Sequence, residues 1–204
     1  MGVFSHWPNR ITALRFVGAV VLFAILALAG DPAPEGVAEI RPTLRVAFWL
    51  FIVTAATDVL DGYLARRDRT VTAFGRIADP FVDKVLILGT FIFLAVLPWS
   101  RPWLPAWIVV VILAREFLVT GIRGYVESLG AEFPADRFGK LKMLLQSITV
   151  AVLFFLHAFD WPAGWFAFWS SAAHALVWAS LVTTVGSGLA YVAKTGRILR
   201  EAAR

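Results

Sequence analysis

The sequence has no cysteine among its 204 residues. A disulfide framework and a metal site built from thiolates are therefore both excluded. Charged residues are also scarce, at 16% of the chain, whereas 59% of the residues are hydrophobic. The mean hydropathy of +0.75 is too high for a soluble domain of this length. These features indicate an integral membrane protein, and no soluble basic domain that would bind nucleic acid is visible.

Long apolar stretches recur along the chain and predict its fold class. A helix needs about 20 apolar residues to cross a bilayer. We therefore expect an all-α membrane protein with six transmembrane helices, which form a single domain over residues 1–204. The expected spans cover about 11–29, 43–65, 79–98, 103–123, 139–159 and 170–193.

The charges between these spans predict their orientation. Arginine and lysine are concentrated in segments 66–76 and 123–142 and in the C-terminal tail, whereas segment 30–42 is net acidic. Such an excess of cations marks the cytoplasmic side of a membrane protein. We therefore expect both termini in the cytoplasm. Tryptophans such as Trp99 and Trp161 gather toward the other side, as in an interfacial aromatic belt.

The first apolar stretch shares features with a cleaved signal peptide. Arg10 and Arg15 precede it, and Ala27-Leu28-Ala29 has the small-residue pattern of a cleavage site. The stretch is long for the apolar core of such a peptide, and the polar residues 9–15 suit a role in a site. We expect it to remain as the first span.

Four aspartates lie in or beside apolar segments in the stretch 58–83. Asp58 and Asp61 are spaced i, i+3, and Asp79 and Asp83 are spaced i, i+4, so each pair shares one helix face. Two antiparallel helices joined by the short basic connection would bring the pairs together at the cytoplasmic surface. Oxygen ligands suit Mg²⁺ or Mn²⁺, and two such ions would match four negative charges. A solvated helix end is the alternative for any single aspartate.

Small and cationic residues accompany the aspartates. Gly62 and Ala65 leave a helix backbone open to close approach by a ligand, and Gly75 precedes Asp79 by four residues. Arg66 offers a bidentate donor suited to phosphate. Together they predict a phosphate site between two helices. Considered alone, Arg66 would be one of the cations that mark the cytoplasmic side, and the small residues would allow helices to pack closely.

The complete pattern, D-x2-D-G-x2-A-R-x8-G-x3-D-x3-D, resembles the signature of the CDP-alcohol phosphotransferases, without departure in residue or spacing. The resemblance implies that Asp58, Asp61, Asp79 and Asp83 bind metal and that Asp83 is also the catalytic base. It implies a polar active-site cavity at the cytoplasmic surface of the inner (plasma) membrane, and a homodimer. The residues implied to bind CDP-diacylglycerol are Asn9, Arg10, Ile11, Thr12, Gly62, Arg66, Thr72 and Gly75.

Three other segments resemble the bacterial phosphatidylglycerophosphate synthases of that family. They are 8–15, 114–123 and 139–142, although Met143 stands where the synthase pattern often has threonine. This resemblance implies transfer of the phosphatidyl group from CDP-diacylglycerol to sn-glycerol 3-phosphate, giving phosphatidylglycerophosphate and CMP. The acceptor is a dianion, so we expect a cationic pocket, in which Glu116 orients Arg115. The candidate cations are Arg115, Arg123, Lys140 and Lys142.

Other functions remain open at this point. The same chemistry could use inositol phosphate, serine or phosphatidylglycerol as the acceptor. Intramembrane prenyltransferases also bind diphosphate through Mg²⁺ and aspartates, but usually in two separated motifs. A cation transporter would favour charges near the bilayer midplane, whereas these aspartates lie at the ends of spans.

Overall fold

The computed structural model describes residues 7–30, 36–68, 73–128, 130 and 137–202. Side chains are described in these ranges except at positions 8, 58–77, 137, 138 and 197–202. Six helices account for almost all of the described residues, which confirms the all-α expectation for this part of the chain. They are α1 (Trp7–Leu28), α2 (Val37–Asp68), α3 (Ala73–Val96), α4 (Ala106–Ser128), α5 (Arg137–Ala158) and α6 (Ala163–Ala202).

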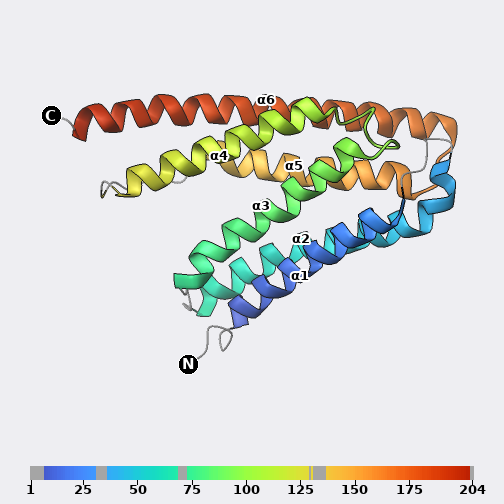
Figure 1. Cartoon of the computed structure of the whole chain (residues 1–204), viewed down its shortest axis with the longest axis horizontal. Coiled ribbons are helices and arrows are strands. Elements are labelled where there is room, and N and C mark those ends of the chain that lie inside the picture. Colours follow the sequence, from blue (N-terminus) through green and yellow to red (C-terminus); the bar gives the residue numbers. More distant parts are fainter. Residues whose placement is uncertain (1–6, 31–35, 69–72, 129, 131–136, 203–204) are drawn as a thin grey trace.

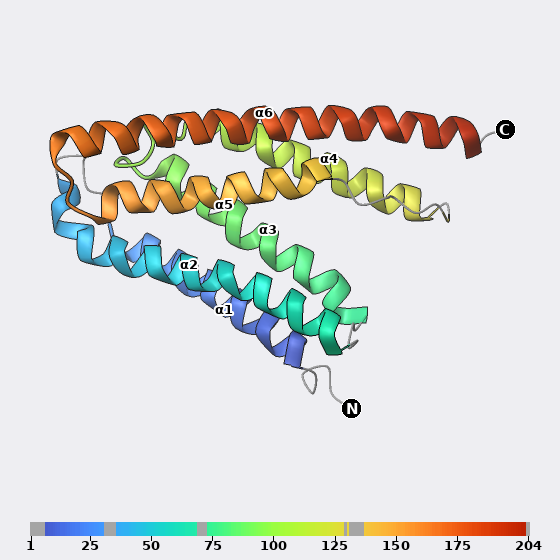
Figure 2. The same cartoon turned by 180° about the vertical axis from the view of Figure 1, so that it is seen from behind.

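The helices form two groups that are linked by α3. α1 and α2 lie side by side along one edge, α6 runs along the opposite edge with α4 and α5 beside it, and α3 crosses between them (Figures 1 and 2). α2 also packs against α5, which joins the two groups. α1 begins and α6 ends on the same side of the molecule, at the left of Figure 1. The two groups diverge toward that side.

Length and composition support a membrane location for four of the helices. Among the described residues, the stretches that could cross a bilayer are Asn9–Leu28, Val37–Thr57, Gly139–Ala158 and Ala163–Gly196. α3 and α4 are apolar but each contains four charged residues. These are Arg76, Asp79, Asp83 and Lys84 in α3, and Arg115, Glu116, Arg123 and Glu127 in α4. α3 and α4 are therefore the two helices that hold most of the described charged candidates.

Several helices extend beyond the spans that the sequence predicts. α2 begins at Val37 instead of 43, α3 begins at Ala73 instead of 79, and α6 covers Ala163–Ala202 instead of 170–193. The prediction followed apolar residues, whereas backbone hydrogen bonding continues a helix past the apolar part. The aspartate-rich stretch is therefore mostly helical.

α1 has a buried face whose character changes along its length. Its buried residues recur every three or four positions, as expected for one face of a helix packed against the core. They are polar in the first half of the helix and apolar in the second: Asn9, Thr12, Arg15, Ala19, Leu22 and Leu26. The apolar half joins the main core, and the polar half lies at the end where α2 finishes and α3 begins.

Two glycines allow α1 to approach its neighbours closely. A Cβ atom at Gly18 would lie 2.7 Å from Thr54 Oγ1 of α2, and one at Gly89 of α3 would lie 2.2 Å from the Phe23 ring of α1. Distances this short are not tolerated by real side chains. The absence of a side chain at both positions therefore brings the polar face of α1 against α2 and α3.

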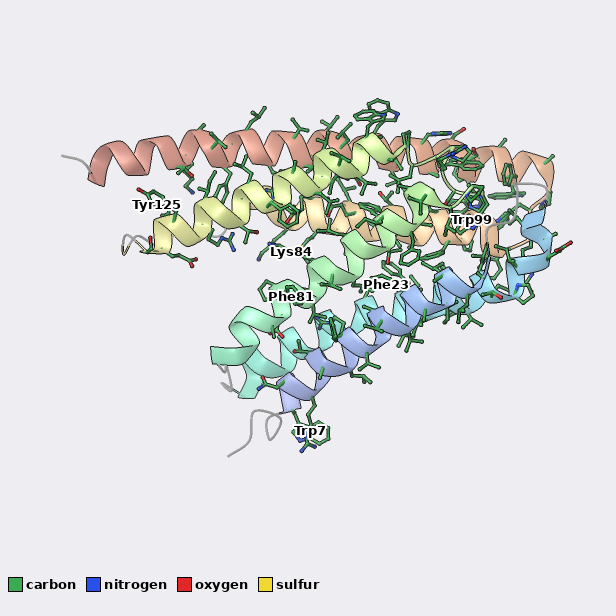
Figure 3. All side chains as sticks on the ribbon, in the orientation of Figure 1. Trp7, Phe23, Phe81, Lys84, Trp99 and Tyr125 are labelled. Atoms are coloured by element: carbon green, nitrogen blue, oxygen red, sulfur yellow. The ribbon has the colours of Figure 1, made fainter. Side chains whose placement is uncertain are left out.

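Aromatic residues collect at the opposite end of the molecule. Trp99 and Trp103 pack on His157 with ring centroids 4.9 and 4.7 Å apart, and Trp103 Nε1 donates a hydrogen bond to Ser170 Oγ at 2.9 Å. Figure 3 shows Trp99 at this end and Trp7 at the other. Trp99 is only 1% exposed, so it belongs to the core and not to an interfacial belt.

Candidate active site

The polar face of α1 contacts both aspartates of α3 whose side chains are described. Thr12 Oγ1 donates to Asp79 Oδ1 at 2.5 Å, and Arg15 Nη1 donates to Asp83 Oδ1 at 2.5 Å. Arg15 Nε also points to Thr57 Oγ1 of α2, at 3.5 Å. Arg15 is almost fully buried, so its charge depends on these partners. α1 thus joins α3 to the part of α2 directly before Asp58.

The structure describes the side chains of two of the four aspartates that are predicted to bind metal. Asp79 and Asp83 lie near the beginning of α3 and are partly exposed, and both offer the oxygen ligands that suit Mg²⁺ or Mn²⁺. Asp58 and Asp61 lie in the last part of α2, but their side chains are outside the described set. Among the described side chains, no group of three or more potential ligands occurs. The donor chemistry of the two described aspartates fits a hard divalent cation.

The residues predicted to bind the nucleotide divide into three groups. Asn9 and Thr12 are buried on the inner face of α1, and Ile11 is partly buried. Arg10 is exposed, and its guanidinium carbon lies 5.4 Å from the centroid of the Trp7 ring. The remaining predicted positions lie outside the described side chains: Gly62, Arg66, Thr72 and Gly75.

A cavity of about 680 Å³ opens beside Asp83, between α3, α4, α5 and α6. It is lined by all four cations that the sequence proposes for the acceptor: Arg115, Arg123, Lys140 and Lys142. Lys84 adds a fifth cation, and the carboxylates in the lining are Asp83, Glu116 and Glu127. The cavity therefore has an excess of positive charge next to a carboxylate of the aspartate motif. Such a site suits a small anion.

Glu116 forms the centre of an ion-pair network in the cavity wall. Arg115 Nη1 lies 3.0 Å from Glu116 Oε1, and Lys142 Nζ contacts the same oxygen. Lys84 Nζ lies 4.0 Å from Glu116 Oε2 and donates to Thr120 Oγ1 at 2.6 Å. Figure 3 shows Lys84 between α3 and α4. The predicted contact between Glu116 and Arg115 is therefore present.

α6 supplies partners for two of the arginines. Ser187 Oγ accepts a hydrogen bond from Arg115 Nη2 at 2.9 Å, and a Cβ atom at Gly188 would lie 3.0 Å from Arg115 Cγ. Tyr191 OH accepts a hydrogen bond from Arg123 Nε at 3.4 Å. The small residues of α6 thus make room for an arginine of α4.

Sequence reasoning did not assign a role to several of these residues. Arg15 was visible as a charge at the start of an apolar stretch, three residues after Thr12, and this spacing could have indicated a partner. Lys84 directly follows Asp83 and could have been included with the cations. Ser187 lies among small residues that are typical of close helix packing, whereas Tyr191 has no local signal. The contacts of both with arginines come from the way α6 packs on α4.

The chain is similar to several known proteins. A family model described as CDP-alcohol phosphatidyltransferase matches residues 5–186. The chain is 35% identical to the CDP-diacylglycerol–glycerol-3-phosphate 3-phosphatidyltransferase of Bacillus subtilis, over 95% of this chain and 96% of that protein. It is 34% identical to the probable phosphatidylglycerophosphate synthase of Mycobacterium tuberculosis (strain H37Rv), over 95% and 83% of the two chains. A Rickettsia felis protein with the same name as the Bacillus protein is 30% identical, over 75% and 77%.

Proposed function

Because the chain belongs to the CDP-alcohol phosphatidyltransferase family, we propose that it transfers the phosphatidyl group of CDP-diacylglycerol to sn-glycerol 3-phosphate. The products are phosphatidylglycerophosphate and CMP. One observation carries the choice of acceptor: the four expected cations line a single cavity together with Asp83. Family membership favours this enzyme class over a prenyltransferase or a cation transporter.

The donor binds where α1, α2 and α3 meet. Asn9 and Thr12 contribute polar groups from the buried face of α1, and the glycines of the motif leave room for the nucleotide. Asp58, Asp61, Asp79 and Asp83 would hold two Mg²⁺ or Mn²⁺ ions, which would neutralise the diphosphate and stabilise the charge on the leaving CMP. Thr12 and Arg15 orient Asp79 and Asp83, respectively.

The acceptor binds in the cavity with its phosphate on the cations. Asp83 accepts the proton of the terminal hydroxyl of glycerol 3-phosphate. The resulting oxygen attacks the phosphorus next to diacylglycerol, and the bond from that phosphorus to the oxygen of CMP breaks. Transfer is direct, because no covalent intermediate is required, and it inverts the configuration at phosphorus. Positioning and electrostatics supply most of the rate, as is general for phosphoryl transfer.

We place the site at the cytoplasmic surface of the inner (plasma) membrane. Six helices cross the bilayer, and both termini lie in the cytoplasm. α1 begins and α6 ends on the same side of the molecule, which supports this placement. The cations are also concentrated at that side. The protein acts as a homodimer, an expectation that light scattering of the purified protein in detergent would test.

The identity of the acceptor is tested by comparing the rates with candidate alcohols that are supplied one at a time. Purified protein is incubated with CDP-diacylglycerol, Mg²⁺ and labelled glycerol 3-phosphate, inositol phosphate, serine or phosphatidylglycerol. The proposal predicts a labelled lipid product with glycerol 3-phosphate at least 100-fold faster than with any other acceptor, as expected for a site that pairs charges with one substrate. A faster reaction with one of the others would overturn the assignment of the acceptor.

A further inference from the structure

Glu116 is a carboxylate buried in the wall of the cavity, with a relative exposure of 6%. A buried charge is costly unless it is paired and hydrogen-bonded. Cations from three helices surround it: Lys84 from α3, Arg115 from α4 and Lys142 from α5. Glu116 is thus the common partner of three cations that approach one another.

The positions of these cations depend on the carboxylate. Lys142 is as buried as Glu116, and without a negative charge the neighbouring cations would repel it. Arg115 has a second anchor at Ser187, but its Nη1 group is directed by Glu116. Lys84 has a second partner in Thr120. Lys142 is therefore the cation that relies most on Glu116.

We propose that Glu116 is the positioning residue of the acceptor-phosphate site, an inference that rests on the proposed function. Its carboxylate gathers Arg115, Lys142 and Lys84 at one wall of the cavity, and the remaining N–H donors of these cations serve the phosphate. Three cations and one carboxylate carry two net positive charges, which match a phosphate monoester dianion. Residues that orient the ligands of a metal ion typically contribute about 10- to 100-fold to affinity or activity, and we expect an effect of similar size here.

Two possible roles of Glu116 predict opposite effects when its charge is removed: it either positions the cations or only lowers the positive charge of the cavity. If the carboxylate only reduced the positive charge of the cavity, Glu116→Gln would strengthen binding of an anion. If it positions the cations, the same change weakens binding, because Lys142 and Arg115 separate. The predicted result is a rise of about 10- to 100-fold in the KM for glycerol 3-phosphate. The KM for CDP-diacylglycerol stays within about twofold, because the donor binds at the other side of Asp83.

The experiment uses the full chain in detergent micelles and three variants. Glu116→Gln removes the charge, Glu116→Asp keeps it but shortens its reach, and Glu39→Gln makes the same change as the first at an exposed position in the first turn of α2. KM and kcat are measured for each substrate, together with inhibition by inorganic phosphate and the temperature of unfolding. We expect the inhibition constant of phosphate to rise in parallel with the KM for the acceptor. Glu116→Asp gives an intermediate rise, and Glu39→Gln behaves as wild type.

An unchanged or lower KM for glycerol 3-phosphate in Glu116→Gln would overturn the inference. Equal rises in the KM for both substrates, with a lower unfolding temperature, would also overturn it by indicating a general structural role. If Glu116→Gln fails to accumulate, Glu116→Asp decides the question by the same criteria. A wild-type protein that does not use glycerol 3-phosphate would contradict the proposed function instead. In that case direct binding of inorganic phosphate, measured by calorimetry, still tests whether Glu116 positions an anion site.

Discussion

Asp83 is the residue at which the two halves of the site meet. It belongs to the aspartate motif, receives Arg15 from α1, and lines the cavity that holds the cations. A carboxylate in this place can contact both the donor and the acceptor. This shared position suits the role as base that the family resemblance implies.

Replacement of Asp83 by asparagine tests that role. Asn keeps the shape of the side chain but cannot accept the proton, so kcat should fall by about 10²- to 10⁴-fold, the usual contribution of a general base. Binding of CDP, measured by calorimetry, should be retained better than in Asp58→Asn, because we expect Asp58, Asp61 and Asp79 to carry most of the metal binding and Asp83 to lie at the edge of the cluster. Near wild-type turnover in Asp83→Asn would show that another group accepts the proton.

Arg15→Lys tests the contact that orients Asp83. A lysine ammonium lacks the planar fork with which Arg15 reaches both Asp83 and Thr57. We expect kcat to fall by about tenfold or more, since a small misplacement of a catalytic group is costly. The KM for glycerol 3-phosphate should change little. Arg101→Lys, an exposed position between α3 and α4, is the control, and equal kinetics in the two variants would contradict the role of Arg15.

At the scale of the helices, close packing of α1 aligns its polar face with α3. Gly18→Ala would place a Cβ atom 2.7 Å from Thr54 Oγ1, so α1 must move away from α2. Overpacking of this kind costs about 1–3 kcal/mol. We predict a lower unfolding temperature and a lower kcat, because Thr12 and Arg15 move with the helix.

Gly186→Ala provides the matched control for that change. Gly186 lies in α6, and an added Cβ atom would have no neighbouring atom of the described residues within 4 Å. The substitution should therefore leave the unfolding temperature and kcat close to wild type. Identical behaviour of the Gly18 and Gly186 variants would argue against close packing between α1 and α2.

The number of helices and their approximate places could be predicted from the sequence, because long apolar stretches are a strong signal. Their ends could not, because α2 and α6 continue as helices after the apolar residues stop. For the site, the regular spacing of Asp79 and Asp83 indicated one helix face. The contacts of Ser187 and Tyr191 with the arginines of α4 depend on how distant helices pack, and no local pattern carries that information.

At the scale of the whole molecule, we propose that the site lies at one membrane surface. Because the chain has no cysteine, a cysteine introduced by mutation would be its one reactive thiol. Ser128→Cys, at the end of α4 near the cavity, should react with a membrane-impermeant maleimide only from the cytoplasmic side. Arg101→Cys, between α3 and α4, should react only from the other side. Both positions are exposed, and labelling of both from the same side would contradict the proposed orientation.

We propose that this chain joins CDP-diacylglycerol to glycerol 3-phosphate at a metal-dependent site. CMP and the lipid product are measured together, with purified protein in micelles. We expect equal amounts of CMP and phosphatidylglycerophosphate, both dependent on glycerol 3-phosphate, abolished by EDTA and restored by Mg²⁺ or Mn²⁺. Release of CMP without glycerol 3-phosphate, or full activity in EDTA, would contradict it.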